Sequence, residues 1–160
     1  TKVEELKHRA DGTWDVITAF DVIEHLDHPI EALRALRSHL TWDGQVVITV
    51  PAFQFLWSHH DELNHHKRRY TATLLDAHLR EAGLRVEWHS YFNSFLFPPI
   101  AAVRLLRTVF PAKGGEPDLG ETPAPINALL DTVFSAERFV LSRARFPFGV
   151  SLIALARPMP

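Results

Sequence analysis

Two short apolar runs place the strongest limit on how this chain folds. The runs are WDVITAF (14–20) and QVVITVP (45–51), in which β-branched and aromatic residues predominate. This composition predicts β-strands, and apolarity that is nearly continuous, rather than alternating, is typical of parallel strands covered on both faces. Residues 25–40 between them predict a helix, with Pro29 suited to its first turn and one apolar stripe along it. Strand, helix and strand within about forty residues indicate a βαβ unit.

The rest of the chain extends this unit into a single α/β domain that covers residues 1–160. Thr71 suits a helix cap and Gly83 a helix stop, so a further helix is expected between them. A turn is expected at 41–44, and strands are expected at 84–92 and 149–158. Helices are expected at 71–82, 99–110 and 125–143. The two later helices make residues 93–147 a helical insert before the last strand.

The chain begins without the glycine-rich turn that normally opens a doubly wound domain. No Gly-x-Gly pattern precedes residue 14, and residues 1–13 form a short charged lead-in. In such domains the first strand and its glycine-rich turn hold the ligand. We therefore expect the sheet to be the second half of a domain whose amino-terminal strands are missing from the chain.

Composition narrows the class of protein further. Apolar residues make up 46% of the chain and charged residues 22%, as in soluble globular proteins. The net charge of −2 argues against nucleic acid as a partner. The absence of cysteine excludes disulfides and thiolate metal sites and fits a reducing compartment. No apolar run is long enough to span a membrane and no secretion signal is visible, so a cytoplasmic location is expected.

Three polar residues, Asp21, Glu24 and His25, follow the first strand within five positions. Ligands of open α/β sheets bind beyond the carboxyl ends of the strands, so these side chains are expected to share a crevice with the segment after Pro51. An alternative is that the two acids only stabilise the positive end of the next helix.

A histidine-rich segment, WSHHDELNHHKRRYT (57–71), comes next. Its spacing matches no zinc signature and no cysteine is present, so the main expectation is that no metal binds. A divalent ion held by Glu24, His25 and a downstream histidine is a minority alternative. Arg68 and Arg69 either pair with acids of the segment or bind a carboxylate or phosphate.

The segment 91–110, YFNSFLFPPIAAVRLLRTVF, is aromatic and apolar. A helix there aligns Ile100, Val103 and Leu106, which is most simply explained by packing on the core. Two alternatives remain open: a channel for an apolar substrate, or a face that makes peripheral contact with a membrane.

These stretches together resemble class I S-adenosylmethionine-dependent methyltransferases, of the large UbiE/ubiquinone-type group. The pattern of that group, FDxVxxxDVLEHLxDP, a helix and then LKPGGxxxxTVP, is similar to WDVITAFDVIEHLDHP and HLTWDGQVVITVP, while LWSHHDELNHHKRRYT and YFNSFLFPP resemble one subgroup. The resemblance covers roughly residues 10–100 and, more generally, the last strand. It implies a Rossmann-like methyltransferase fold, a three-layer α/β/α sandwich whose mostly parallel sheet has its last strand antiparallel between two neighbours.

The resemblance also implies a cofactor and a set of site residues. S-adenosylmethionine would lie near Phe20, Asp21 and Val22, with His25 close by. The acceptor, a small molecule or a lipid-like compound, would be enclosed by residues 52–70 and the insert, and whether it is methylated on oxygen or carbon stays open. The acceptor contacts implied are Trp57, Asp61, Arg68, Arg69 and Tyr70.

The sequence departs from the family pattern in two places. Trp42-Asp43-Gly44 replaces the usual Pro-Gly-Gly and still suits a turn. The glycine-rich loop and the acid that binds the cofactor ribose would precede residue 1, so the chain is expected to be a fragment, or a domain completed by a partner. Some relatives bind a divalent ion through an acid-x-x-Glu-His pattern and a later histidine, and Asp21, Glu24, His25 and His66 are similar in type.

Methyl transfer to a hydroxyl requires a base that removes the proton. His60 and His66 are the candidate bases, with Asp61 expected to orient His60 and His25 to orient the cofactor. Two other functions remain open: an NAD(P)-dependent Rossmann oxidoreductase, which shares the pattern of strands and helices, and a non-catalytic methyltransferase-like domain that binds a partner.

Overall fold

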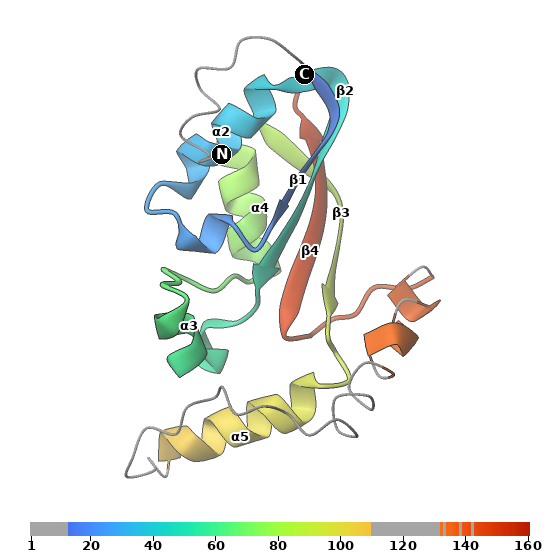
Figure 1. The fold of residues 1–160 in the computed structure, drawn as a ribbon. Helices are drawn as coiled ribbons and strands as arrows, with labels where there is room; N and C mark the ends of the chain where they lie inside the picture. Colours follow the sequence, from blue (N-terminus) through green and yellow to red (C-terminus); the bar gives the residue numbers. More distant parts are fainter. Residues whose placement is uncertain (1–12, 110–131, 133, 138, 142) are drawn as a thin grey trace.

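The computed structural model describes residues 13–109 and, within 132–160, all residues except 133, 138 and 142. They form an α/β fold (Figure 1). The strands are β1 (Trp14–Phe20), β2 (Leu40–Pro51), β3 (Leu84–Phe92) and β4 (Ser151–Pro158). The helices are α2 (Pro29–Ser38), α3 (His59–Leu63), α4 (Ala72–Glu81) and α5 (Phe97–Val109), with 3-10 turns η1 (Ile23–His25) and η2 (Gln54–Leu56).

The four strands form one sheet in the order β1-β2-β4-β3. β1 and β2 are parallel, with Ala19 opposite Ile48, whereas β4 is antiparallel to both of its neighbours. β1, β2 and β3 therefore run in one direction, and β4 lies reversed between β2 and β3. This arrangement confirms the expected mostly parallel sheet with its last strand inserted antiparallel.

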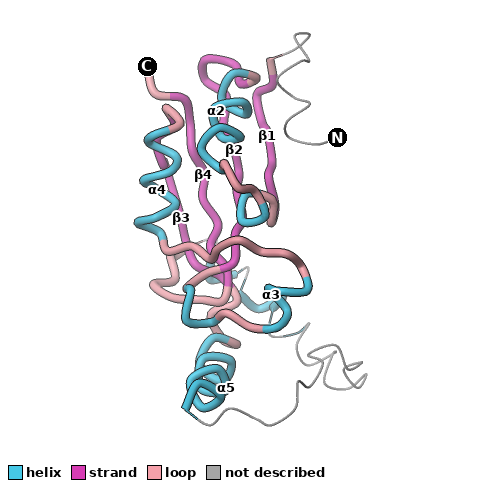
Figure 2. The backbone as a smooth tube through the Cα atoms, turned by 90° about the vertical axis from the view of Figure 1, so that its left-hand side faces the viewer, coloured by secondary structure: helices cyan, strands magenta, loops and turns pink. Residues whose placement is uncertain are grey.

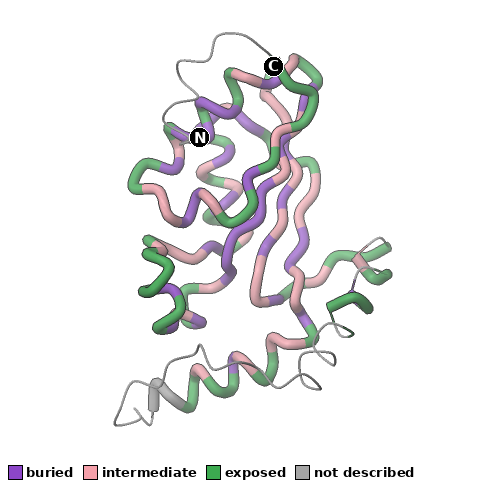
Figure 3. Tube along the Cα trace, viewed as in Figure 1, coloured by how far each residue is buried: buried purple, intermediate pink, exposed green. Residues whose placement is uncertain are grey.

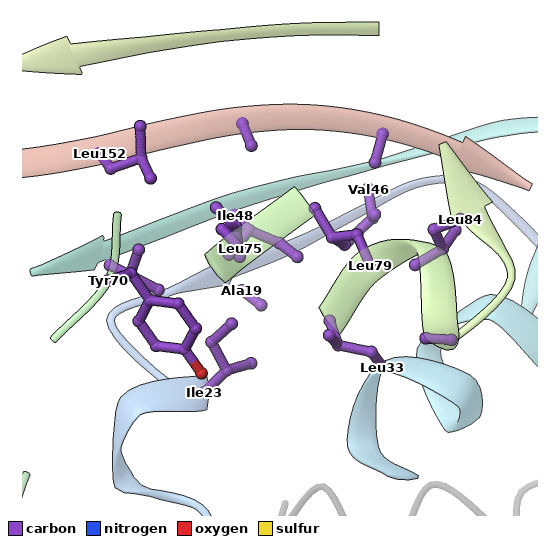
Figure 4. Packing of buried hydrophobic residues seen from close by; sticks show 14 of the residues in the cluster. Ala19, Ile23, Leu33, Val46, Ile48, Tyr70, Leu75, Leu79, Leu84 and Leu152 are labelled. Carbon is purple, nitrogen blue, oxygen red and sulfur yellow. The ribbon is translucent and has the colours of Figure 1, made fainter. Parts of the chain in front are cut away.

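Helices α2 and α4 cover one face of the sheet and enclose the core (Figures 1 and 2). Every second strand residue faces these helices, because successive side chains of a strand point to opposite faces. Fully buried members of the core include Val46 and Ile48 of β2, Leu152 of β4, Leu33 of α2, and Leu75 and Leu79 of α4 (Figure 4). Because each fully buried side chain of this size contributes about 1.5–3 kcal/mol, this interface is the main source of stability in the described residues.

No helix of the described residues covers the opposite face of the sheet. Val16 and Phe20 of β1 point to this face and are 50% and 55% exposed. Of the three layers expected, the described part of the chain therefore supplies two, the helices and the sheet. β1 also pairs only with β2, so its other edge is unpaired within the same residues.

Two boundaries near residue 40 differ from the prediction. The helix expected at 25–40 begins at Pro29 and ends at Ser38, because the His39 N–H turns back to the Leu36 carbonyl and Leu40 already pairs with Trp14. Residues 41–44, expected as a turn, belong to β2. Gly44 suits this position, since a Cβ there would lie 2.9 Å from the Trp14 carbonyl oxygen.

The insert expected at 93–147 is described in part. Its first helix, α5, begins at Phe97 rather than at 99, and residues 132–141 are helical wherever they are described. The predicted helix start at 125 and the preceding glycine- and proline-rich loop lie outside the described residues. Among the helices that are described, none has the length and apolar character needed to cross a bilayer.

Candidate active site

The ends of β1 and β2 carry the polar residues that were predicted to form a site. The Asp21 N–H donates to the Thr49 carbonyl oxygen at 3.0 Å, and the Thr49 hydroxyl donates to Asp21 Oδ1 at 3.2 Å. Asp21 has a φ of 50°, in the left-handed region that few residues other than glycine adopt. Phe53 after β2 and Asn93 after β3 share this conformation, with φ of 55° and 58°. The chain therefore leaves each of the three parallel strands in a sharp turn.

A pocket with a volume of about 350 Å³ opens at this edge of the sheet. It lies where β1 and β2 end, next to the start of β4 and the segment around α3. Its lining residues are Asp21, Glu24, His25, Pro51, His60, Asn64, His66, Arg69, Val150 and Ser151. The fold thus brings together the two groups of polar residues, after β1 and after β2, that the sequence singled out.

Several residues expected to contact the cofactor or acceptor do not line this pocket: Phe20, Val22, Trp57, Asp61, Arg68 and Tyr70. Tyr70 is wholly buried in the core, where burial raises its pKa to about 12. Arg68 donates to the Leu26 carbonyl oxygen at 2.8 Å. In the structure these two side chains stabilise the walls behind the pocket.

Glu24 is wholly buried at the base of this site. Neither of its carboxylate oxygens has a hydrogen-bond partner among the described residues, and His25 Nε2 lies 3.8 Å from Oε1. Burial, with a smaller contribution from the Asp21 charge, raises the pKa of the Glu24 carboxyl to about 7. A buried carboxylate without partners is costly, so this group is available to bind a proton or a cation.

Asp61 is buried as completely as Glu24 but is surrounded by hydrogen-bond donors. Arg69 binds it with two parallel bonds, Nε to Oδ1 at 2.8 Å and Nη2 to Oδ2 at 3.0 Å. The Ser58 N–H and hydroxyl donate to Oδ2 at 2.9 and 3.1 Å, and His66 Nδ1 lies 2.8 Å from Oδ1. Burial alone would raise the pKa of Asp61, but the bonds from Arg69 and His66 hold it below its ordinary value. Ser58, Asp61, His66 and Arg69 are called the Asp61 cluster below.

The Asp61 cluster bears on three residues of the predicted site. Asp61 contacts His66 rather than His60, the histidine it was expected to orient. Asp61 and Arg69, both expected to bind the acceptor, bind each other, and Arg69, which also lines the pocket, donates to the Ala52 carbonyl oxygen at 3.0 Å. His60 is exposed and lines the pocket.

Glu24, His25 and His66 together form a set of donors suited to a metal ion. One ligand atom from each lies within 4.8 Å of those from the other two, and the two imidazole rings meet edge to face with centroids 4.6 Å apart. Because Asp61 occupies His66 Nδ1, the Nε2 atom of that ring remains for a ligand. One carboxylate and two imidazoles, one of them oriented by a second carboxylate, fit a divalent transition-metal ion.

Beside the pocket, aromatic rings pack into a wall between the sheet and α5. Phe53 stacks on Tyr91 with ring centroids 4.9 Å apart and contacts Phe97 of α5 at 5.6 Å, and Phe97 contacts Phe148 at 5.3 Å. These rings connect the loop after β2, the first turn of α5 and the residues before β4. The insert is thereby attached to the sheet directly beside the pocket.

Three functional or supporting residues were not foreseen. Ser58 caps α3 in a capping box with Asp61, and its Ser-x-x-acid spacing was a usable signal. Asn64 lines the pocket because it follows α3. Glu137 accepts hydrogen bonds from the N–H groups of Asn93 and Phe95 at 2.6 and 2.8 Å. These residues are more than forty positions apart in the sequence, so no local pattern predicts the contact.

A comparison with known protein families assigns the chain. Residues 2–89 match the model of a family described as a methyltransferase domain, and this match covers more than half of the 160 residues. The chain belongs to the methyltransferase domain family. Among proteins of curated function, none matches this methyltransferase domain.

Solved structures of methyltransferases share this fold. A SAM-dependent methyltransferase from Archaeoglobus fulgidus superposes with a TM-score of 0.53 at 19% identity, over 97% of this domain and 64% of that protein. An O-methyltransferase family protein from Burkholderia thailandensis superposes with a TM-score of 0.52 at 12% identity, over 99% of this domain and 34% of that protein. The methyltransferase domain described here therefore spans less than two thirds of the length of either protein.

Proposed function

We propose that the protein transfers a methyl group from S-adenosylmethionine to a small-molecule or lipid-like acceptor. The observation that carries the proposal is the pocket at the ends of β1 and β2, where a methyltransferase family sheet presents Asp21, His25 and His60 to one cavity. The motifs after the two strands further support membership of the UbiE/ubiquinone-type group.

The cofactor's positively charged methionine end fits the acidic side of the pocket. Asp21 lines the cavity and is held by Thr49, so its charge is fixed in position to attract a sulfonium or ammonium group. When bound, S-adenosylmethionine supplies a methyl group activated for displacement. His25 lies beside Asp21 in the lining and holds the cofactor side of the cavity, with the exposed Phe20 ring next to it in sequence.

His60 is the group we assign to proton removal. It lies in the pocket wall with an exposed side chain, whereas His66 is held by Asp61 and faces Glu24 and His25. For a hydroxyl acceptor, His60 takes the proton as the acceptor oxygen forms its bond to the methyl carbon and the carbon–sulfur bond breaks. Alignment of acceptor and methyl supplies much of the remaining rate.

A divalent cation at Glu24, His25 and His66 is the second cofactor we propose, although the sequence alone disfavoured it. The supporting observation is Glu24, a buried carboxylate with no hydrogen-bond partner in the described residues. A cation there would neutralise that charge and bind an acceptor oxygen beside His60. Titration of the protein with Mn²⁺ by calorimetry tests this: Glu24→Gln is expected to abolish the heat, and an exposed control, Glu62→Gln, to preserve it.

The main test separates the methyltransferase from its rivals by ligand binding. S-adenosylhomocysteine is expected to bind in calorimetry, with affinity reduced on the order of tenfold in Asp21→Asn and unchanged in Asp43→Asn in the distant early part of β2. Binding of NADH in its place would support the oxidoreductase. Absence of any heat would support the non-catalytic domain or a fragment that lacks part of the cofactor site.

The base assignment is tested by separating turnover from cofactor affinity. His60→Ala is expected to lower kcat on the order of a hundredfold or more while S-adenosylhomocysteine binds as before. His66→Ala is expected to remove Mn²⁺ binding, which His60→Ala leaves intact. Unchanged turnover in His60→Ala would eliminate His60 as the base.

A further inference from the structure

The helical insert exposes large apolar side chains beside the pocket. In α5, Val103, Leu105 and Leu106 are 47%, 56% and 59% exposed, and the described length of this helix is mostly exposed or half-exposed (Figure 3). In the helical residues 132–141, Phe134 and Phe139 are also exposed. Exposed apolar side chains that gather in one region of a protein usually mark a contact surface.

The same two segments are strongly cationic in a chain that is acidic as a whole. Residues 93–109 and 132–148 contain Arg104, Arg107, Arg138, Arg143 and Arg145, and their only acid is Glu137. Glu137 is buried and bonded to the Asn93 and Phe95 N–H groups, so it adds no acidic group to the surface. The net charge of the chain is −2, so these two segments differ in charge from the chain as a whole.

Both segments lie at one end of the molecule. In Figure 1 they lie beyond the end of the sheet at which β1 and β2 terminate. Glu137 joins them, because it holds the turn that leads into α5. Apolar side chains and arginines are thus presented on one connected part of the fold, which will be called the insert surface and comprises residues 97–106, 132, 134–137, 139–141, Arg143 and Arg145.

We propose that the insert surface binds an anionic lipid membrane peripherally. Leucine and phenylalanine side chains enter the boundary between head groups and acyl chains, while arginines pair with lipid phosphates. Arginines near an anionic membrane strengthen its binding, so the positive charge of these segments favours lipid over a neutral apolar partner. A second copy of this chain is a poorer occupant, because it would bring arginines against arginines.

The position of the insert surface gives this contact a consequence for the pocket. Phe53, Phe97 and Phe148 form a continuous aromatic contact from α5 to the residues before Val150, which lines the pocket. A membrane bound at the insert surface would therefore lie beside the cavity. The lipid contact itself does not depend on the proposed methyl transfer.

Flotation of the protein with lipid vesicles tests the proposal without cofactor or acceptor. The protein is expected to float with vesicles of equal parts phosphatidylcholine and phosphatidylglycerol, and much less with pure phosphatidylcholine. Added salt is expected to weaken the binding, because it screens the arginine–phosphate attraction. No flotation with the anionic vesicles at low salt would overturn the proposal.

Two variants assign the binding to this surface. Leu105→Ser/Leu106→Ser is expected to lower partitioning on the order of tenfold or more by removing two inserted side chains. Arg143→Gln/Arg145→Gln is expected to lower it on the order of tenfold on anionic vesicles only. All four side chains are at least partly exposed, and circular dichroism should show the fold unchanged.

Matched controls lie on other parts of the fold. Trp42→Ser removes an aromatic ring that is 88% exposed in the early part of β2, and Arg80→Gln removes an exposed arginine of α4; both are expected to bind vesicles as the unmodified protein does. Equal losses in these controls and in the test variants would contradict the assignment. A dimer in sedimentation that Leu105→Ser/Leu106→Ser dissociates, with no vesicle binding, would assign the surface to a second copy instead.

Discussion

The carboxylate of Asp61 receives donors from Ser58, His66 and Arg69 while it is wholly excluded from water. Asp61→Asn keeps the shape of the side chain but leaves the Arg69 charge without its partner. Removing one member of a buried ion pair costs about 3–5 kcal/mol, and we expect a loss of that size in the free energy of unfolding, measured by urea denaturation.

Asp76→Asn is the matched control for this prediction. Asp76 also binds an arginine, Arg80, at 2.8 Å, but the pair lies on the surface of α4. A pair of this kind contributes about 0.3–0.5 kcal/mol, so the control should lose little stability. Similar losses in the two variants would show that burial of the Asp61 pair is not what matters.

Glu24 is expected to make the stability of the protein depend on pH near neutrality. Its pKa is raised from 4.5 to about 7, so between these values the folded protein holds a proton that the unfolded chain has released. Stability should therefore fall as the pH rises through this range, by about 3 kcal/mol for this group, and then level off. Urea denaturation at a series of pH values, with a chelator present, measures the slope.

Glu24→Gln should remove that slope, because glutamine does not titrate. Glu62→Gln, at an exposed position of α3, should keep it. The difference in slope between Glu24→Gln and the unmodified protein isolates the effect of this carboxyl. Other titrating groups, such as His78, contribute equally to both proteins; burial lowers the pKa of His78. Parallel pH profiles of the two proteins would rule out the assignment.

Sequence reasoning grouped most of the pocket residues but misassigned one contact. Asp21, Glu24 and His25 follow a strand end, and the topology of parallel sheets was enough to place them beside the segment after β2. The partner of Asp61 was harder, because His60 is its neighbour in sequence but points elsewhere on α3. His66 reaches Asp61 only because the chain reverses at His65, whose φ is 55°.

Gly149, just before β4, is the position among the elements at which a side chain is least tolerated. A Cβ there would overlap the backbone of Phe92 at the end of β3, and backbone atoms in a paired strand cannot move aside. Gly149→Ala should therefore destabilise the protein by about 1–3 kcal/mol or more and weaken the attachment of the insert, as thermal unfolding would measure.

Gly83→Ala provides the comparison. Gly83 has a φ of 79°, and the atoms nearest its added Cβ belong to the flexible Arg37 side chain. Only the left-handed conformation then opposes alanine, at about 1–2 kcal/mol. A larger loss at Gly83 than at Gly149 would contradict the packing argument.

The sequence predicted best those elements whose ends are marked by an abrupt change from apolar to polar residues. β1 ends as predicted at Phe20, where the polar run begins, and β3 occupies 84–92 as expected. The region around residue 40 was misread because Leu40 continues the apolar stripe of α2 and Asp43-Gly44 is typical of a turn. Pairing with Trp14 decides the matter, and that contact is not visible in the local sequence.

For the whole molecule, the edge strand β1 should be less protected against hydrogen exchange than the central strand β4. It pairs only with β2 in the described residues, whereas β4 pairs on both sides. Amides of β1 that point to the unpaired edge are expected to exchange with deuterium at least about tenfold faster than those of β4, as NMR would measure. Equal protection in the two strands would show that β1 is covered on that edge.

The overall topology could not have been obtained from local patterns alone. The run GVSLIALARP predicts a strand, but nothing in it specifies β2 and β3 as neighbours or the reversed direction. The resemblance to methyltransferases supplied that order. Physical reasoning then explains the stability of the result, because Leu152, Ala154 and Ala156 of β4 complete the core face.

The left-handed residues Asp21, Phe53 and Asn93 after the three parallel strands have a consequence for laboratory evolution. A positive φ costs a bulky residue such as Phe53 about 1–3 kcal/mol and costs Asp or Asn less, so selection for heat resistance would favour glycine most strongly at Phe53. Two of them, Asp21 and Phe53, belong to the pocket lining and the aromatic wall beside it. Thermostable variants obtained this way would accumulate their gains where ligand contacts are lost, and a screen that keeps both heat and activity as criteria should retain Asp21 and Phe53.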